Sequence, residues 1–370
     1  MEPKIRLNGF SGEWKKVKLE NIYTLSAAGD LRKDLFSPTK DINHPYPIFS
    51  NSLENAGLYG YSSEYRYEKD ALTITGRGTL GHAEYRTECF DAIIRLLILQ
   101  PKKEICNIFV KEYINHKSPF VYESTGVPQL TIPQIKDIEI PIPPSKDEQR
   151  ALATFFTSLD NKISAAEKRL ASLKQVKAAS LQAMFPQEGE TTPKLRFKGC
   201  EGEWKKVKLG EIVRLKAGNS LSLAQLKEWG SYPCYGGNGI RTYLPFFSHD
   251  GEYNLIGRVG ALCGNINYVN GKFYATEHAL VVYPFDDINV RFLFYVLVFA
   301  DLNKYKKGCA QPVLSASTLY NVDIIIPPSL TEQRQIASYF TSLDRQITSQ
   351  SSKISKLKQI KSACLDQMFV

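Results

Sequence analysis

Residues 12–19 read GEWKKVKL, and residues 202–209 read the same eight letters. The match extends upstream, because PKIRLNGFSGEWKKVKL from Pro3 agrees with PKLRFKGCEGEWKKVKL from Pro193 at 12 of 17 positions without a gap. A segment that recurs at this length marks an internal repeat.

A second match lies at an offset of 184 residues. It relates IPPSKDEQRALATFFTSLDNKI from Ile142 to IPPSLTEQRQIASYFTSLDRQI from Ile326. The chain therefore consists of two similar repeats, about 1–187 and 193–370, each with a constant start, a variable middle and a constant end.

Composition limits the class of protein. With 370 residues and 43% hydrophobic content, the chain can form two or more domains with real cores. The most apolar window, RFLFYVLVFA from Arg291, is too short to span a bilayer, so we expect a cytoplasmic protein without membrane contact. The net charge of +9 suggests a polyanionic partner.

The seven cysteines are an odd number, and none lies within four positions of another cysteine or of a histidine. This spacing argues against a disulfide framework and against a zinc site, so we expect no metal.

The constant ends predict two long helices. Ser145 with Glu148, and Ser329 with Glu332, each have the spacing of a capping box at a helix start. After each box, apolar residues recur alternately three and four positions apart, as in a coiled-coil seam. The seam residues are Phe156, Leu159, Ile163, Leu170 and Leu173 in the first helix, and Phe340, Leu343, Ile347, Ile354 and Leu357 in the second.

Such a stripe needs a partner, and antiparallel pairing of the two helices would relate the repeats by a pseudo-two-fold axis. The alternative is that each stripe covers only its own globular domain.

The variable middles predict mixed α/β domains. Short β-rich runs bounded by turn residues alternate with helical runs such as NIFVKEYIN from Asn107. The β-rich runs are DALTITGRG, FDAIIRLLIL and KDIEIPIPP in the first repeat, and EYNLIGRVG, HALVVYP and VDIIIPP in the second. The predicted fold class is α+β (mixed), with two similar globular domains and two long antiparallel helices.

One series of features occurs twice in the same order: W-x-x-V-x-L, a strand with a G-R turn, I-x-I-P-P-S, and E-Q-R before a long helix. With this series, the chain resembles the specificity subunit of type I restriction-modification systems. The resemblance implies target recognition domains at 1–144 and 188–328, and long spacer helices at 145–187 and 329–370. It further implies that each domain reads one half of a bipartite site in double-stranded DNA. The helices would set the spacer and dock two adenine methyltransferase subunits, which restriction subunits join in the full complex.

Motifs for catalysis are weak. GRGTLG from Gly76 to Gly81 matches G-x-G-x-x-G, but HAEYRTECF after it predicts another strand and not the helix that a dinucleotide site needs. An amino methyltransferase would have Asp or Asn before Pro-Pro and an aromatic residue after it, where Ile142 and Ser145 stand here. We therefore expect a subunit that is not an enzyme and holds no cofactor.

Base readers should lie where the repeats differ and side chains can make bidentate contacts, Arg to guanine and Asn or Gln to adenine. The candidates are Asn51, Arg66, Arg77, Arg86 and Gln129 in the first repeat, and Asn238, Arg241, Arg258, Asn265 and Gln311 in the second. Lys15, Lys16, Lys205 and Lys206 are candidates for phosphate contacts, with a solvated surface as the alternative. Trp14 and Trp204, identical in both repeats, are expected in the cores.

Three other functions stay open on the sequence. They are a stand-alone DNA-binding protein or dormant cassette without partners, an enzyme in its own right, and a coiled-coil scaffold with no DNA role. The missing motifs disfavour the enzyme, and the variable middles disfavour the scaffold.

Overall fold

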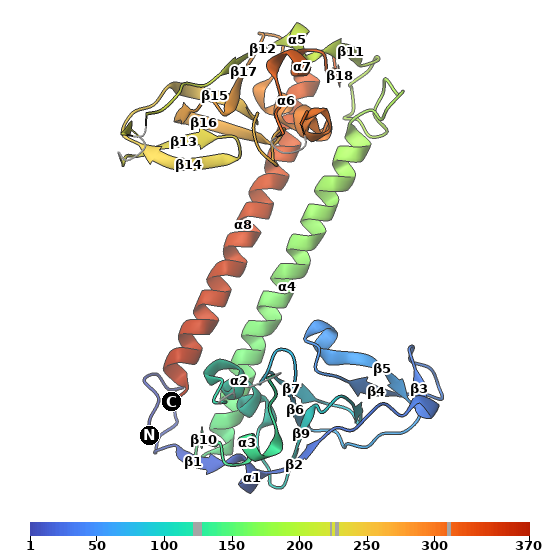
Figure 1. The fold of residues 1–370 in the computed structure, drawn as a ribbon, viewed down its shortest axis with the longest axis vertical. Helices are drawn as coiled ribbons and strands as arrows, with labels where there is room; N and C mark the ends of the chain where they lie inside the picture. The colour runs from blue at the N-terminus through green and yellow to red at the C-terminus, as the bar shows by residue number, and fades with distance from the viewer. Residues whose placement is uncertain (121–127, 223, 226–228, 309–311) are drawn as a thin grey trace. The chain divides into compact units, whose positions relative to one another are not determined.

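The computed structural model describes residues 1–120, 128–222, 224–225, 229–308 and 312–370. It divides into two compact units, shown in Figure 1. Unit 1 contains Met1–Glu167 and Ser352–Val370, and unit 2 contains Lys168–Ser351. Each unit therefore takes its globular part from one repeat and a stretch of long helix from each repeat.

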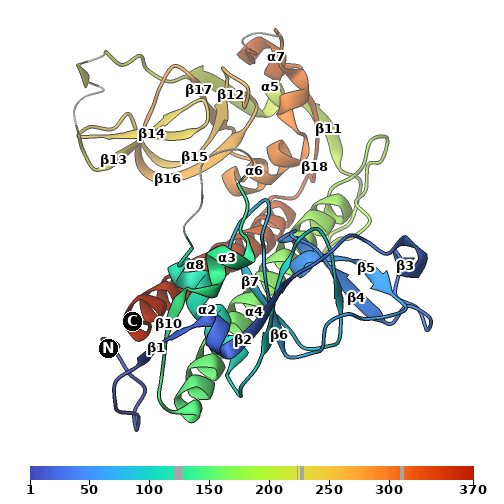
Figure 2. The same ribbon diagram turned by 60° about the horizontal axis from the view of Figure 1, so that its bottom comes forward.

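The described residues of unit 1 form three small sheets. Strand β1 pairs antiparallel with β10, and the four-stranded sheets have the orders β2-β9-β6-β7 and β3-β5-β4-β8. The elements are β1 (Lys15–Lys18), α1 (Leu19–Ile22), β2 (Tyr23–Ala27), η1 (Lys33–Leu35), β3 (Phe36–Ser37), β4 (Tyr46–Phe49), η2 (Glu54–Gly57), β5 (Leu58–Ser62), β6 (Ala71–Ile74), β7 (Ala83–Arg86), β8 (Asp91–Ala92), β9 (Leu97–Pro101), α2 (Asn107–Lys117), α3 (Ile132–Lys136) and β10 (Glu139–Ile142). Helix α2 packs against β6 and β7 and shares one core with the long helix α4 (Lys146–Met184), beside which it lies in Figure 2.

Unit 2 repeats this plan with one larger sheet. Strand β11 pairs antiparallel with β18, and the six-stranded sheet has the order β12-β17-β15-β16-β13-β14. The elements are β11 (Lys205–Lys208), α5 (Leu209–Ile212), β12 (Val213–Ala217), β13 (Tyr232–Gly236), β14 (Gly239–Leu244), β15 (His249–Gly257), β16 (Ile266–Ala275), β17 (Ala279–Pro284), α6 (Val290–Phe299), η4 (Leu302–Tyr305), α7 (Ala316–Tyr320) and β18 (Asp323–Ile326). The fold class predicted from the sequence is confirmed.

One predicted strand differs. The run FDAIIRLLIL forms two strands, β8 and β9, because Ile94 and Arg95 between them have φ angles of 58° and 57°. These angles lie in the left-handed region, which a strand cannot contain. Apolar residues stand on both sides of the break in a nearly continuous run, so the hydrophobic pattern did not reveal it.

The two long helices are α4 (Lys146–Met184) and α8 (Leu330–Met368). They run antiparallel within each unit. In unit 1, Lys361 near the end of α8 contacts Asp160 near the start of α4, at 2.7 Å. In unit 2, Lys177 near the end of α4 contacts Asp344 near the start of α8. These ion pairs occupy equivalent positions of the two repeats.

The ten seam residues are all buried or half-buried. Phe156 and Leu159 pack in the core of unit 1, and Phe340 and Leu343 pack in the core of unit 2. Each helix therefore covers its own domain near its start. Leu173, further along α4, packs against the core of unit 2 that contains Phe340 and Leu343 of α8, so the stripe does not serve only its own domain.

The constant start of each repeat binds the first turn of a long helix. Arg6 donates to both carboxylate oxygens of Glu148, at 2.8 and 2.7 Å, and Arg196 does the same to Glu332. The amide N–H of Glu148 donates to Ser145 Oγ at 3.4 Å, which is half of the predicted capping box. The glutamate of each box therefore fixes an upstream arginine.

The residue after each long helix enters the core of the unit where that helix ends. Phe185 packs with Trp204 and Phe292 in unit 2, whereas Phe369 packs with Trp14 and Phe156 in unit 1. Both tryptophans are 2% exposed, which confirms their prediction as core residues. Each core is thus completed by a phenylalanine from the other repeat.

Candidate nucleic-acid interface

Both units build the same framework around a glycine-arginine turn. Strand β4 pairs parallel with β8 in unit 1, as β13 does with β16 in unit 2. Beside them, the Gly76-Arg77 turn follows β6, and Gly257-Arg258 lies at the end of β15. Loops that differ in sequence are therefore held in corresponding places.

In unit 1 this framework brings several turns together, which we call the turn cluster: Asn51, Gly76, Arg77, Ile94, Arg95 and Leu130. The Oδ1 atom of Asn51 accepts from the amides of Gly76 and Arg77, at 2.7 and 3.3 Å. Leu130 N donates to Gly76 O at 2.9 Å. A Cβ at Gly76 would lie 2.8 Å from Arg95 O, so only glycine allows this approach.

In unit 2 the corresponding loops line a hollow of about 490 Å³. Its lining includes Asn238, Arg241, Val259 and His278. A Cβ at Gly257 would lie 1.9 Å from Gly237 O, so the backbone of Gly237, which lines the hollow, meets that of Gly257 only because residue 257 is glycine. Asn265 Nδ2 donates to Asn238 Oδ1 at 3.1 Å and joins two candidate base readers.

Two arginine candidates of unit 1 are engaged inside the domain. Arg66 pairs with Asp91, a carboxylate that is 1% exposed, and donates to Ala92 O at 2.7 Å. Arg86 is 6% exposed, and its guanidinium lies 3.7 Å from the ring of Phe49. Burial lowers the pKa of Arg86 to about 10. Both guanidinium groups stabilise the β4–β8 region in this structure.

The other candidates differ in exposure. Gln129, Asn238 and Arg241 are exposed, and Arg258 and Asn265 are half-buried. The Nε atom of Arg258 is buried without a hydrogen-bond partner among the described residues. Gln311 lies outside the described residues.

The lysine candidates lie on the separate two-stranded sheets. Lys15 and Lys16 are exposed on β1, and Lys205 and Lys206 are exposed on β11. Lys206 pairs with Asp323 at 3.0 Å, and hydrogen bonds from Lys208 and Lys206 lower the pKa of that carboxyl. Of the four, Lys206 thus has part of its charge offset within the protein.

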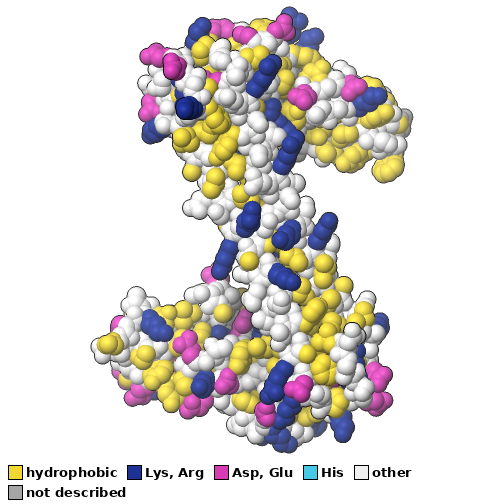
Figure 3. Space-filling view, turned by 180° about the vertical axis from the view of Figure 1, so that it is seen from behind, with side chains coloured by type: hydrophobic (Ala, Val, Ile, Leu, Met, Phe, Trp, Pro, Cys, Tyr) yellow, Lys and Arg dark blue, Asp and Glu magenta, His cyan; other side chains and the backbone are white. Residues whose placement is uncertain are grey.

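Further basic side chains follow the long helices, as Figure 3 shows on one face. Exposed members are Lys162, Lys168, Arg169 and Lys174 on α4, and Arg345, Lys353, Lys356 and Lys358 on α8. A surface with this charge suits a polyanion.

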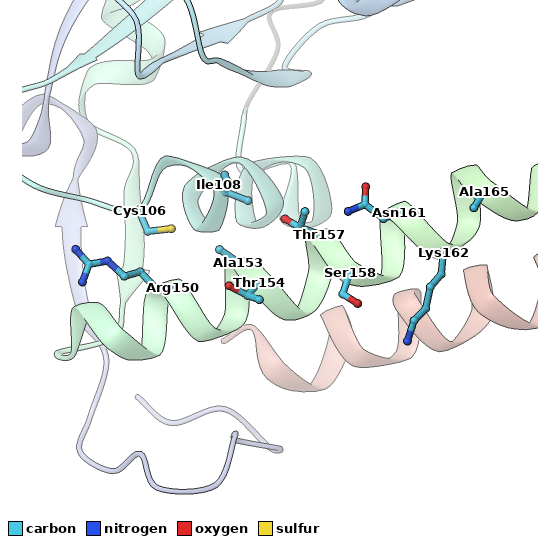
Figure 4. Close-up of a pocket in the computed structure, with 10 residues that line it drawn as sticks. All are labelled: Cys106, Ile108, Arg150, Ala153, Thr154, Thr157, Ser158, Asn161, Lys162 and Ala165. Atoms are coloured by element: carbon cyan, nitrogen blue, oxygen red, sulfur yellow. The ribbon is translucent and has the colours of Figure 1, made fainter.

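A groove of about 640 Å³ lies beside α2 and α4 in unit 1 (Figure 4). It is lined by Cys106, Ile108, Arg150, Ala153, Thr154, Thr157, Ser158, Asn161, Lys162 and Ala165. These side chains include no carboxylate or imidazole, so the groove offers no general acid or base of those types. Within the described ranges, no group of three or more His, Cys, Asp or Glu residues could hold a metal ion. No helix among the same residues is long and apolar enough to cross a membrane.

The chain belongs to the family of the type I restriction modification DNA specificity domain, whose model matches residues 11–175 and 201–359. The two matches fall on the two repeats. The matched ranges include both glycine-arginine turns and most of each long helix.

Among curated proteins, the type I restriction enzyme EcoprrI specificity subunit of Escherichia coli is 41% identical over 174 residues, or 46% of this chain. The chain spans 42% of that relative's length. A putative type I specificity subunit, S.MgeORF438P of Mycoplasma genitalium, is 22% identical and is aligned over 100% of this chain and 97% of its own length.

Among solved structures, the S subunit of a type I restriction-modification system from M. genitalium matches with a TM-score of 0.73 and 18% identity. The match covers 100% of this chain and 99% of that chain. A chain from a structure on complex assembly and conformational transition of a type I R-M system matches with a TM-score of 0.54 and 18% identity, over 98% and 99% of the two chains. At this identity the matches show a shared fold.

Proposed function

We propose that this chain is a DNA specificity subunit that places a separate adenine methyltransferase on a bipartite sequence. The observation that carries the proposal is the repetition of one framework with different side chains on it. Asn51 and Arg77 stand beside the turn of unit 1, whereas Asn238, Arg241 and His278 line the hollow of unit 2. Two domains that share a framework but carry different side chains at the candidate contact positions suit two half-sites of different sequence.

In this proposal, residues 1–144 and 188–328 are the two target recognition domains, and 145–187 and 329–370 are the spacer helices. The exposed lysines of β1 and β11 contact phosphates, since they are identical in both repeats and phosphates are the same in every sequence. The exposed arginines and amides at the turns read bases.

The catalytic partners are also part of the proposal. Two methyltransferase subunits dock on the helices, and restriction subunits join them in the complete complex. The methyl donor and any nucleoside triphosphate then belong to these partners.

The test is methylation with and without the partner. The purified chain alone should transfer no methyl groups and cut no DNA, and it should confer sequence-specific adenine methylation when its cognate methyltransferase subunit is added. Methylation by the chain alone would identify it as an enzyme. Specific DNA binding with no effect on any methyltransferase encoded beside it would favour the stand-alone DNA-binding protein.

A further inference from the structure

Asn51 joins two separate turns of unit 1. Its Oδ1 atom accepts from the amides of Gly76 and Arg77, and its Nδ2 atom donates to Ile94 O at 2.6 Å. Both ends of the side-chain amide are therefore bonded inside the protein. An asparagine that reads adenine needs both ends for the base.

The second turn has an unfavourable backbone. Ile94 and Arg95 both have left-handed φ angles, and Ile94 is β-branched, which makes this conformation costly. The turn is held by Ile94 N donating to Gly29 O at 3.0 Å and Arg95 N donating to Ala28 O at 3.2 Å. Together with the bond from Asn51, these contacts fix the backbone from which the Arg95 side chain projects.

Arg77 and Arg95 are exposed, and neither guanidinium has a hydrogen bond or ion pair in the described part of the chain. Arg32, Arg66 and Arg86, the nearby arginines of unit 1, are bonded to protein groups. The turn cluster thus presents two uncompensated guanidinium groups on rigid backbone. Such a placement suits a bidentate ligand outside the protein.

The side chain at the position of Arg95 differs in chemistry between the units, although an equivalent hydrogen bond precedes it in both. Ile93 N donates to Phe49 O in unit 1, and Thr276 N donates to Tyr235 O in unit 2. Two residues after these amides stand Arg95 and His278, and His278 lines the hollow of unit 2. His278 does not share the left-handed φ of Arg95, so the two residues have equivalent places and different local backbones. A side chain that changes at an equivalent place beside the candidate base readers is expected of a specificity position.

We infer that Asn51 is a positioning residue and that the two turns it joins present Arg77 and Arg95 to guanine edges in the first half-site. The inference rests on the proposed function. It gives Asn51 a positioning role in place of the base-reading role predicted from the sequence. It also adds Arg95, which the sequence did not single out, to the candidate base readers.

The test uses the full chain with its cognate methyltransferase. The site methylated by the wild-type complex is mapped first, and duplexes carrying that site are made with 7-deazaguanine in place of each guanine in turn. Because arginine binds guanine through O6 and N7, this replacement should weaken wild-type binding about 5- to 150-fold at the guanines that are read. Arg77→Ala and Arg95→Ala should each abolish the penalty at one guanine of the first half-site and leave the second half-site unchanged.

Arg241→Ala in unit 2 is the matched control, and it should change only the second half-site. Asn51→Ala should weaken discrimination at both guanines, and combined with Arg77→Ala it should add only the loss at the guanine read by Arg95. Asn51→Asp retains the acceptor for Gly76 and Arg77 but sets an oxygen against Ile94 O. It should therefore keep the guanine preference of Arg77 and lose that of Arg95.

Several results would overturn the inference. One is a first half-site without guanine on either strand. Another is that the arginine variants weaken binding to all sequences equally and reduce the salt dependence, which would indicate phosphate contacts. If the wild-type complex showed no sequence-specific methylation at all, the proposed function itself would fail, and this inference with it.

Discussion

Arg6 forms a two-pronged ion pair with Glu148, 142 residues further along the chain, and Arg196 forms the same pair with Glu332. Both carboxylates are 1% exposed. The arginines also donate to backbone oxygens of the GEW segment, since Arg6 bonds Gly12 O at 2.7 Å and Arg196 bonds Gly202 O at 2.5 Å. The constant start of each repeat therefore binds the first turn of a long helix.

Arg6→Ala should leave the Glu148 carboxylate buried without its partner. Removing one member of a buried pair costs about 3–5 kcal/mol, so we expect a large loss in the free energy of unfolding of unit 1, measured in urea. Arg150→Ala is the control, because Arg150 forms its pairs at the surface, where its side chain is 61% exposed. Equal effects of the two variants would show that the Arg6 pair adds nothing beyond a surface contact.

A fragment of residues 1–187 should form a homodimer. Its core lacks Phe369, but the Phe185 of a second copy could fill the space beside Trp14 and Phe156, because Phe185 occupies the equivalent place beside Trp204 in unit 2. With the methyltransferase, this dimer should modify a palindrome built from the first half-site and its inverted repeat. Sedimentation and methylation mapping would test both expectations.

Phe185→Ala in that fragment is the matched variant, and it should reduce dimerisation. A dimeric fragment that methylates only the original asymmetric site would show that the two repeats are not equivalent.

Lengthening both long helices should lengthen the spacer between the half-sites. Seven residues inserted after Glu167 and seven after Ser351 preserve the three-four spacing of the seam and add about 10 Å to each helix. This length corresponds to roughly three base pairs at about 3.4 Å each. A methylome should show both half-sites unchanged and a longer spacer.

Four residues inserted into α4 alone, near Ala171, add about 6 Å, or roughly two base pairs, and place the seam out of register. We expect that variant to lose part of its activity. An altered half-site with the original spacer would contradict the role of the helices in spacing.

The stability of unit 2 should fall at acidic pH through His249. Its ring stacks on Phe273 at 5.0 Å and contacts Tyr283 Oη at 2.8 Å, and burial lowers the pKa of His249 below its usual 6.5. The unfolded chain therefore binds the proton first as the pH falls below about 6.5, which favours unfolding. When the pH is lowered from 7.5 to 5, the Tm of the His249→Phe variant should fall by less than the Tm of the wild type. Parallel pH profiles would exclude this histidine as the cause.

The repeats, the long helices and the tryptophan cores could be predicted because they depend on local patterns that occur twice. The turn cluster could not. The break at Ile94 and Arg95 lies within an apolar run, and its backbone is held by bonds from Ala28, Gly29 and Asn51, distant in sequence. Residue type alone likewise did not separate Arg77, exposed beside the turn, from Arg86, whose charge stacks on Phe49.

The exchange of phenylalanines has a consequence for the order of folding during synthesis. Unit 2 is a continuous stretch, Lys168–Ser351, and can fold as soon as the ribosome has released it. Unit 1 begins earlier but waits for Phe369, and at about 5–20 residues per second the intervening 184 residues take roughly 10–40 s. During that time the apolar pocket beside Trp14 and Phe156 has no occupant from its own chain. The part of the protein made first is therefore the part finished last, and a nascent chain that stalls in between exposes a surface for chaperones or for another chain.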